Sequence, residues 1–306
     1  MSPSPRSGRH RFATAALTAL LSLSLAACSG SGSASTASVP AKAPPTASRQ
    51  DVPAVTTPNV PKKSAQPPTP SSILYLIYQK DGDGALSYEV NDHAVATYWY
   101  GYEFDAAGKH WYTGFAYNSP EIYGPVDDNH IPAPATPVNI TEVTLYKESA
   151  ASEKDWTIDG SSPTIGEFGA YERGGEIDTA RKPERQDASE NRFVLAIPTK
   201  FFADGVDSYE YEVFLFDPAD LDLDVNYGRK RWSYVGNIHA GSDNGASCGN
   251  EAGDTPCVKH KGTLSFGPAG ADGLPTIRIA MSGAEAAQGN TEYRYDAAKK
   301  QYVAQP

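Results

Sequence analysis

The chain has 306 residues, of which 40% are hydrophobic, and a formal net charge of −11. Its acidic residues gather in the C-terminal part, where residues 73–306 carry 36 Asp and Glu against 19 Lys and Arg. The negative field of these residues repels the phosphates of nucleic acids, so we do not expect nucleic acid as a partner. A basic protein, a cation or a neutral glycan is easier to accommodate.

The N-terminus has the features of a secretory signal. Arg6, Arg9 and Arg11 form a basic start, and an apolar run of 16 residues follows and ends at Leu25-Ala26-Ala27-Cys28. A membrane-spanning helix needs about 20 apolar residues, so a cleaved signal peptide over residues 1–27 is the better interpretation. The closing motif resembles the lipobox of bacterial lipoproteins.

This resemblance implies that the thiol of Cys28 carries diacylglycerol and anchors the mature protein in a membrane of the cell envelope. The residue after the cysteine is Ser29 rather than Asp. By resemblance to enterobacterial lipoprotein sorting, this favours the outer membrane.

Residues 28–72 are expected to form a disordered linker behind the lipidated cysteine. After Cys28 this segment contains nine Pro and nine Ser and no aromatic residue. Such a composition cannot bury enough apolar surface to offset the entropy of ordering the chain. The linker is expected to hold the folded region away from the membrane.

Residues 73–306 are predicted to form an acidic, β-rich domain, either as one unit or as two subdomains. Ile73–Tyr78 is a short apolar run of β type, and Asp81–Gly84 is a hairpin signal that leads into the strand Leu86–Val90. In several later segments apolar and polar residues alternate, and with 27 Gly and 24 Pro between short strands the pattern predicts an all-β fold. We expect an antiparallel sandwich or a barrel-like pair of sheets.

The further strands predicted from this pattern are Ala94–Phe104, His110–Tyr117, Val138–Lys147, Arg192–Ile197, Ser208–Phe216, Trp232–Ile238, Gly262–Phe266, Thr276–Ser282, Thr291–Tyr295 and Gln301–Ala304. The longest polar break between them is Glu172–Asn191, which is dense in charge. A loop of this length without secondary structure is either mobile or functional, and we expect a mobile one.

Cys248 and Cys257 are the only cysteines left once Cys28 carries lipid. In an oxidising envelope such a pair is expected to form a disulfide. A metal site with His239 and His260 is the alternative, but the spacing matches no zinc module and no C-x-x-C is present. A row of carboxylates at Asp220, Asp222 and Asp224 is expected to be a solvated strand edge, so we predict neither a metal site nor a cofactor.

The segment Tyr98–Tyr117 holds nine aromatic residues. On a regular strand Tyr98, Tyr100 and Tyr102 share one face, and rings with a hydroxyl edge suit the faces of sugars. These three residues and Trp111 are therefore the candidate ligand-binding residues. The alternative is that the rings fill the core or tile the sheet, where Tyr has a high β propensity.

No residue pattern points to a catalytic site, so we predict no catalytic residues. The sequence favours a membrane-anchored envelope lipoprotein with a non-catalytic binding or assembly role, whose glycan or protein ligand contacts the aromatic hairpin. Two alternatives stay open. One is a glycan-active hydrolase that uses Asp or Glu, and the other is a structural surface protein whose acidic coat meets a basic partner.

Overall fold

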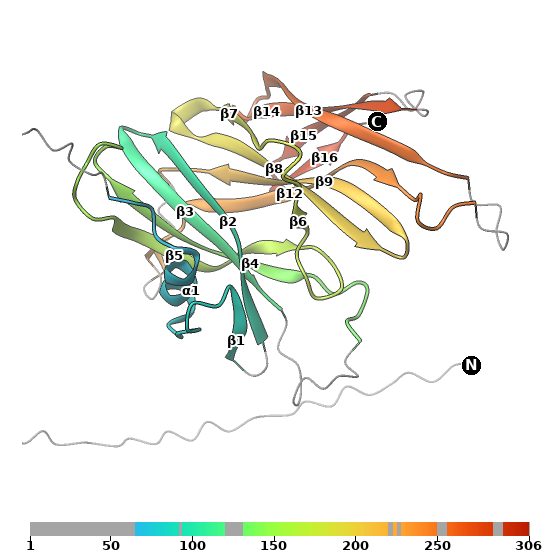
Figure 1. The fold of residues 1–306 in the computed structure, drawn as a ribbon. Coiled ribbons are helices and arrows are strands. Elements are labelled where there is room, and N and C mark those ends of the chain that lie inside the picture. The colour runs from blue at the N-terminus through green and yellow to red at the C-terminus, as the bar shows by residue number, and fades with distance from the viewer. Residues whose placement is uncertain are drawn as a thin grey trace, which may run out of the picture. The chain divides into compact units, whose positions relative to one another are not determined.

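The computed structural model describes residues 65–91, 94–119, 131–219, 223–224, 228–249, 256–283 and 290–305. These residues form an all-β fold of two packed antiparallel sheets with one short α-helix (Figure 1). Within the described residues neither sheet closes on itself, so the fold is a sandwich. Cys28 and most of the predicted linker lie outside the described residues.

The first sheet has seven strands in the order β1-β2-β3-β4-β5-β11-β10. Its longer members form a meander in which each strand pairs with the next one along the chain. The strands are β1 (Ser87–Asn91), β2 (Ala94–Ala106), β3 (Lys109–Asn118), β4 (Val138–Lys147), β5 (Thr157–Phe168), β10 (Leu223–Asp224) and β11 (Gly228–Arg229).

The second sheet has nine strands in the order β16-β15-β14-β13-β12-β9-β8-β6, with β7 also paired to β8. The strands are β6 (Glu176–Ile177), β7 (Glu184–Asp187), β8 (Phe193–Ala203), β9 (Val206–Phe216), β12 (Trp232–Asp243), β13 (Lys259–Ala269), β14 (Pro275–Gly283), β15 (Asn290–Asp296) and β16 (Gln301–Ala304). A 3-10 turn, η1 (Ser189–Asn191), lies between β7 and β8.

The central strands β8, β9 and β12 are buried on both faces. Phe193, Phe214 and Trp232 point into the core between the two sheets. The alternating residues Val194 and Val213 belong to a second core, which also includes apolar residues of β13, β14 and β16. The two cores share strands, so the fold is stabilised as one sandwich.

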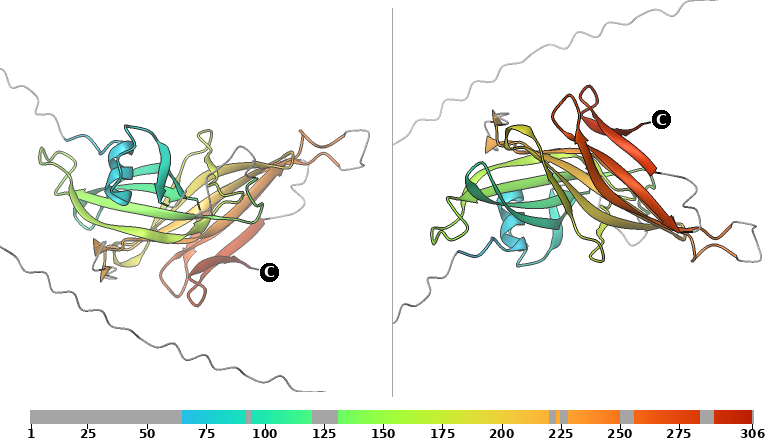
Figure 2. Two further views of the ribbon diagram at one scale, coloured as in Figure 1. Left: turned by 90° about the horizontal axis from the view of Figure 1, so that it is seen from below. Right: turned by 90° about the horizontal axis from the view of Figure 1, so that it is seen from above.

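The apolar run at Ile73–Tyr78 is not a strand, as the sequence predicted, but part of the helix α1 (Pro70–Tyr78). Thr69 caps the helix by accepting a hydrogen bond from the backbone N–H of Ser72, and Pro70 suits the first turn. The buried side chains of Ile73 and Leu74 pack against β2, β3 and β4. Figure 2 shows the helix beside the sheet that these strands form. Burial on the sheet therefore outweighs the β propensity of the run.

The folded region also begins earlier than the expected boundary at residue 73. The ammonium group of Lys147 donates to the carbonyl of Ala65, and the indole N–H of Trp156 donates to that of Gln66, at 3.2 and 2.9 Å. The end of the predicted linker is thus held against the ends of β4 and β5.

The segment Glu172–Asn191 is another correction, because the structure gives it secondary structure. The short strands β6 and β7 both pair with β8. Between them, buried Asp178 accepts a hydrogen bond from Arg181 at 2.7 Å. Backbone pairing and this ion pair hold a segment whose charge density had suggested a mobile loop.

The predicted strands from Ala94 onward are all present, although most extend further than their pattern indicated. The strand β5 was not predicted, because its polar and glycine-rich sequence shows no alternation. The expected row Asp220, Asp222 and Asp224 lies mostly outside the described residues.

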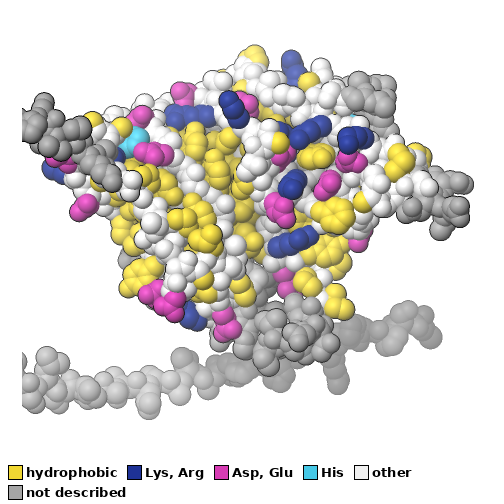
Figure 3. Space-filling view, viewed as in Figure 1, with side chains coloured by type: hydrophobic (Ala, Val, Ile, Leu, Met, Phe, Trp, Pro, Cys, Tyr) yellow, Lys and Arg dark blue, Asp and Glu magenta, His cyan; other side chains and the backbone are white. Residues whose placement is uncertain are grey.

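Charged side chains are mixed on the surface. On the face shown in Figure 3, Lys and Arg lie mainly over the right-hand half, where Asp and Glu alternate with them. Among the described residues, ion pairs between exposed side chains include Lys200–Glu176, and Lys299 also pairs with Asp296. The excess of acid in the sequence therefore does not produce a uniformly acidic surface on this face.

Candidate functional site

The aromatic hairpin of β2 and β3 differs from the expected platform at one position. A β-bulge at Trp99 breaks the alternation of β2, since Tyr98 pairs with Ala116 and Tyr100 with Phe115. Tyr98 consequently packs on the side of α1, while Tyr100 and Tyr102 pack against the core between the sheets. The prediction that the three rings share one face is wrong.

The aromatic rings of the hairpin pack against one another and against the core. Tyr102 lies 5.4 Å from Phe104 and 6.5 Å from Tyr100, centroid to centroid. Trp111 is only 3% exposed, and its indole N–H donates to the carbonyl of Ala106 at 2.8 Å. Burial raises the pKa of Tyr100 to about 12. The exposed parts of these tyrosines are divided between two faces of the sheet.

A polar cleft of about 430 Å³ opens instead where β4 begins and β5 ends. It lies against the inner faces of β8, β9 and β12, and it combines aromatic rings with carboxylates and an amide. The residues that line it are Pro137, Glu167, Phe168, Gly169, Ala170, Phe201, Ser208, Glu210, Tyr234 and Asn237. We refer to this space as the polar cleft.

A second β-bulge gives the polar cleft its donors. The register of β12 shifts between Tyr234 and Gly236, and Gly236 adopts a φ of +123°, which favours glycine. Asn237 therefore faces the same side as Tyr234. Its amide nitrogen donates to Glu210 Oε2 at 2.8 Å and to Glu212 Oε1 at 3.0 Å.

Glu212 lies behind the polar cleft and is fully buried. The hydroxyl of Tyr234 donates to Glu212 Oε2 at 2.6 Å. Burial, helped by the nearby Glu210, raises the pKa of Glu212 to about 7, although the hydrogen bonds from Tyr234 and Asn237 act in the opposite direction. Near neutral pH this carboxyl group is therefore protonated in a large fraction of molecules.

A smaller pocket of about 310 Å³ lies beside the turn between Ala170 and Arg173, at the end of β8. The ring of Tyr171 stacks on Phe201, with 6.0 Å between centroids, and the Arg173 guanidinium lies 4.7 Å from the centre of the same ring. The lining residues are Pro132, Tyr171, Arg173, Phe202, Ala203 and Asp204. We refer to this space as the arginine pocket.

The sequence did not indicate either space. Glu210 and Glu212 were visible only as part of a strand that alternates Tyr with Glu, and Arg173 lies in the segment expected to be mobile. For Glu210 and Glu212 one signal was present in the sequence: they lie at positions i and i+2 of β9, and a strand places such residues on the same face.

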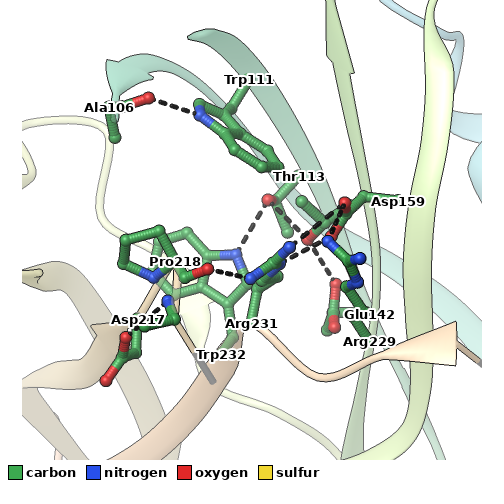
Figure 4. Close-up of polar contacts among 12 residues, drawn as sticks. Ala106, Trp111, Thr113, Glu142, Asp159, Asp217, Pro218, Arg229, Arg231 and Trp232 are labelled. Atoms are coloured by element: carbon green, nitrogen blue, oxygen red, sulfur yellow. Dashed lines mark hydrogen bonds and ion pairs between the residues drawn. The ribbon is translucent and has the colours of Figure 1, made fainter. Parts of the chain in front are cut away.

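A buried polar network lies between the sheets (Figure 4). None of its residues lines the polar cleft or the arginine pocket. The indole N–H of Trp232 donates to Thr113 Oγ1, which is 3.0 Å from Thr144 Oγ1, and Thr144 donates to Glu142 Oε2 at 2.6 Å. Glu142 is fully buried, and its Oε1 makes no hydrogen bond within the described residues.

A buried ion pair flanks this network. Arg231 Nε donates to Asp159 Oδ2 at 2.6 Å, and Arg231 also donates to the carbonyl of Pro218. The two side chains are 4% and 7% exposed. Such a pair holds β5 against the start of β12, because removal of either partner would leave a buried charge uncompensated.

The structure confirms the predicted disulfide between Cys248 and Cys257. Both thiols are used in this bond, so they are not available as ligands with His239 and His260, whose ring centroids are 6.5 Å apart. In the part of the chain that the structure describes, no group of three His, Cys, Asp or Glu residues is arranged to hold a metal ion.

Comparison of the chain with protein-family models, with curated protein sequences and with solved structures found no match. The pockets are therefore interpreted from their own chemistry. Among the described residues no helix has the length and apolarity to cross a membrane.

Proposed function

We propose that this chain is a lipid-anchored lipoprotein of the bacterial envelope whose β domain binds a glycan in the polar cleft. The observation that carries the proposal is the composition of the cleft. Phe201 and Tyr234, which are both partly exposed, offer ring surface, and Glu210 and Asn237 offer hydrogen-bonding groups beside it. Sugars have apolar C–H faces and polar edges, so they match such a lining.

The position of the cleft in the fold supports the proposal. Lys147 and Trp156 hold the segment at Ala65 and Gln66 at one end of β4, and Pro137 lines the cleft at the other end. The ten residues of β4 separate these ends by about 30 Å. The chain thus enters the described domain at the end of β4 opposite the cleft, and the attachment point is not part of the cleft lining.

The test is glycan binding by the lipidated protein in detergent micelles, with soluble fragments of cell-wall polymer as the probe. Glu167→Gln and Glu210→Gln keep side-chain size and remove a charged acceptor, and each is expected to weaken binding about tenfold. Glu190→Gln, whose side chain is 79% exposed outside the cleft, is the matched control and should leave binding unchanged. Equal affinities for all variants would refute the polar cleft as the glycan site.

Hydrolysis of a glycan is the second candidate, because Glu212 holds a proton near neutral pH beside the carboxylate of Glu210. A general acid must reach the leaving oxygen, but Glu212 is buried behind Tyr234 and Asn237, which favours binding over catalysis. Labelled polymer separates the two functions. Release of label that disappears in Glu212→Gln would establish a hydrolase.

A further inference from the structure

Arg173 is unusual among the arginines of this acidic chain. The structure describes eight arginines, and seven of them have a carboxylate oxygen within 4.0 Å. Arg173 has no such partner among the described residues. In a domain with almost twice as many acids as bases, an arginine without a carboxylate partner is available to bind an anionic group of a ligand.

Arg173 is nevertheless held in a defined position. Its Nη2 donates to the carbonyl of Phe202 at 2.7 Å, and its guanidinium lies 4.7 Å from the centre of the Phe201 ring. Stacking on the ring and one hydrogen bond to the backbone orient the side chain before any ligand arrives. A group ordered in advance loses less entropy on binding.

Asp204 supplies the opposite charge in the same pocket. Its Oδ2 accepts a hydrogen bond from the hydroxyl of Tyr171 at 2.9 Å, which orients the carboxylate. Asp204 and Arg173 both line the arginine pocket, but they do not form an ion pair with each other. The pocket thus holds two opposite charges apart, beside the apolar surface of Pro132 and of Phe202, which is 52% exposed.

The backbone of this region keeps an unfavourable conformation. Tyr171 and Glu172 are the central residues of a tight turn between Ala170 and Arg173, and both have left-handed φ angles, of 52° and 58°. Such turns prefer Asn and Gly, and strain of this kind gathers at binding sites. Here the turn places the Tyr171 ring on Phe201 and its hydroxyl on Asp204.

We propose that the arginine pocket binds the zwitterionic head of an α-amino acid. Arg173 binds the carboxylate, Asp204 binds the ammonium group, and the side chain of the ligand packs on Phe202 and Pro132. A volume of about 310 Å³ suits a ligand of this size. The proposal does not depend on glycan binding in the polar cleft.

The test measures binding of L-leucine to the full-length lipidated protein in detergent by calorimetry, alongside N-acetyl-L-leucine and L-leucine methyl ester. Each blocked compound lacks one of the two charges, and each is expected to bind at least tenfold more weakly than leucine. Asp204→Asn should weaken leucine binding to a similar extent without unfolding the protein, because Asn also suits a left-handed turn position. Arg173→Ala should do the same.

Arg294→Ala is the matched control, since it removes the same charge from an exposed arginine paired with Glu292. It should leave leucine binding unchanged. Failure of leucine to bind overturns the proposal, as does equal binding of the methyl ester, which would rule out recognition of the carboxylate by Arg173. Equal binding of the N-acetyl compound would likewise rule out Asp204 as the ammonium site.

Discussion

At the scale of single residues, Glu142 is a carboxyl group enclosed between the sheets. Burial raises its pKa to about 8, although the hydrogen bond from Thr144 acts in the opposite direction. This net value already includes the charge of Asp159, which raises the pKa, and those of Lys230 and Arg231, which lower it. Because the ordinary value is 4.5, the folded state binds this proton more tightly than the unfolded state does.

Glu142 therefore stabilises the fold fully below about pH 4.5, and this contribution is lost as the pH rises through about 8. Urea unfolding at pH 5 and pH 8 should show the loss, on the order of 4 kcal/mol. Glu142→Gln keeps the shape of the neutral acid. In this variant the stability lost between pH 5 and pH 8 should be smaller, and the remaining loss should come from Glu212. Exposed Glu167→Gln is the control, and a pH dependence that is the same in all three proteins would contradict this assignment.

Tyr100 tests whether the aromatic hairpin is a packing element. Tyr100→Ala removes a half-buried ring that contacts Trp99 and Tyr102 and should lower the free energy of unfolding by about 2–4 kcal/mol. Tyr75→Ala removes the same ring from a position that is 50% exposed and should cost less than about 1 kcal/mol. Thermal unfolding compares the two, and similar melting temperatures would show that Tyr100 is not a packing residue.

At the scale of elements, the contact between α1 and β3 depends on a glycine. A Cβ at Gly114 would lie 2.5–2.8 Å from three side-chain atoms of Ile73. Gly114→Ala should therefore destabilise the protein by about 1–3 kcal/mol through overpacking. Combining Gly114→Ala with Ile73→Ala should recover part of the stability that Gly114→Ala loses. A double-mutant cycle, measured by urea unfolding, gives the coupling energy between the two positions. Strictly additive effects would mean that the two residues do not collide.

The disulfide closes a short loop beyond β12. Replacement of both Cys248 and Cys257 by Ala should destabilise the fold by about 2–3 kcal/mol, as expected for a loop of this length. Thermal unfolding with and without a reductant provides the measurement. Reductant should lower the melting temperature of the parent protein to that of the double variant and leave the variant itself unchanged. A variant that also loses stability in reductant would contradict this.

At the scale of the whole molecule, the lipid anchor that we propose at Cys28 would decide at which membrane the β domain works. Cys28→Ser removes the thiol expected to accept lipid, so the protein should move from the membrane pellet to the soluble fraction. Fractionation of cells and immunodetection check this, and the parent protein should sediment with the outer membrane. A variant that remains in the pellet as firmly as the parent would contradict the lipoprotein assignment.

The sequence by itself determined the features that depend on local pattern or on counting. Short runs of residues with high β propensity between turn signals predicted strands such as β4 and β16 with their observed bounds. The disulfide followed from the presence of only two further cysteines. These inferences need no knowledge of which segments meet in space.

Only the tertiary structure decided which faces are covered and which distant residues meet. Covering both faces of β9 buries Glu212, a residue that alternation alone would assign to solvent. Packing on a sheet makes Ile73 helical, and the bulge at Trp99 turns Tyr98 away from Tyr100. Arg173 and Asp204 line one pocket although they are 31 positions apart in the chain. Their proximity results from the packing of the whole fold and not from their place in the sequence.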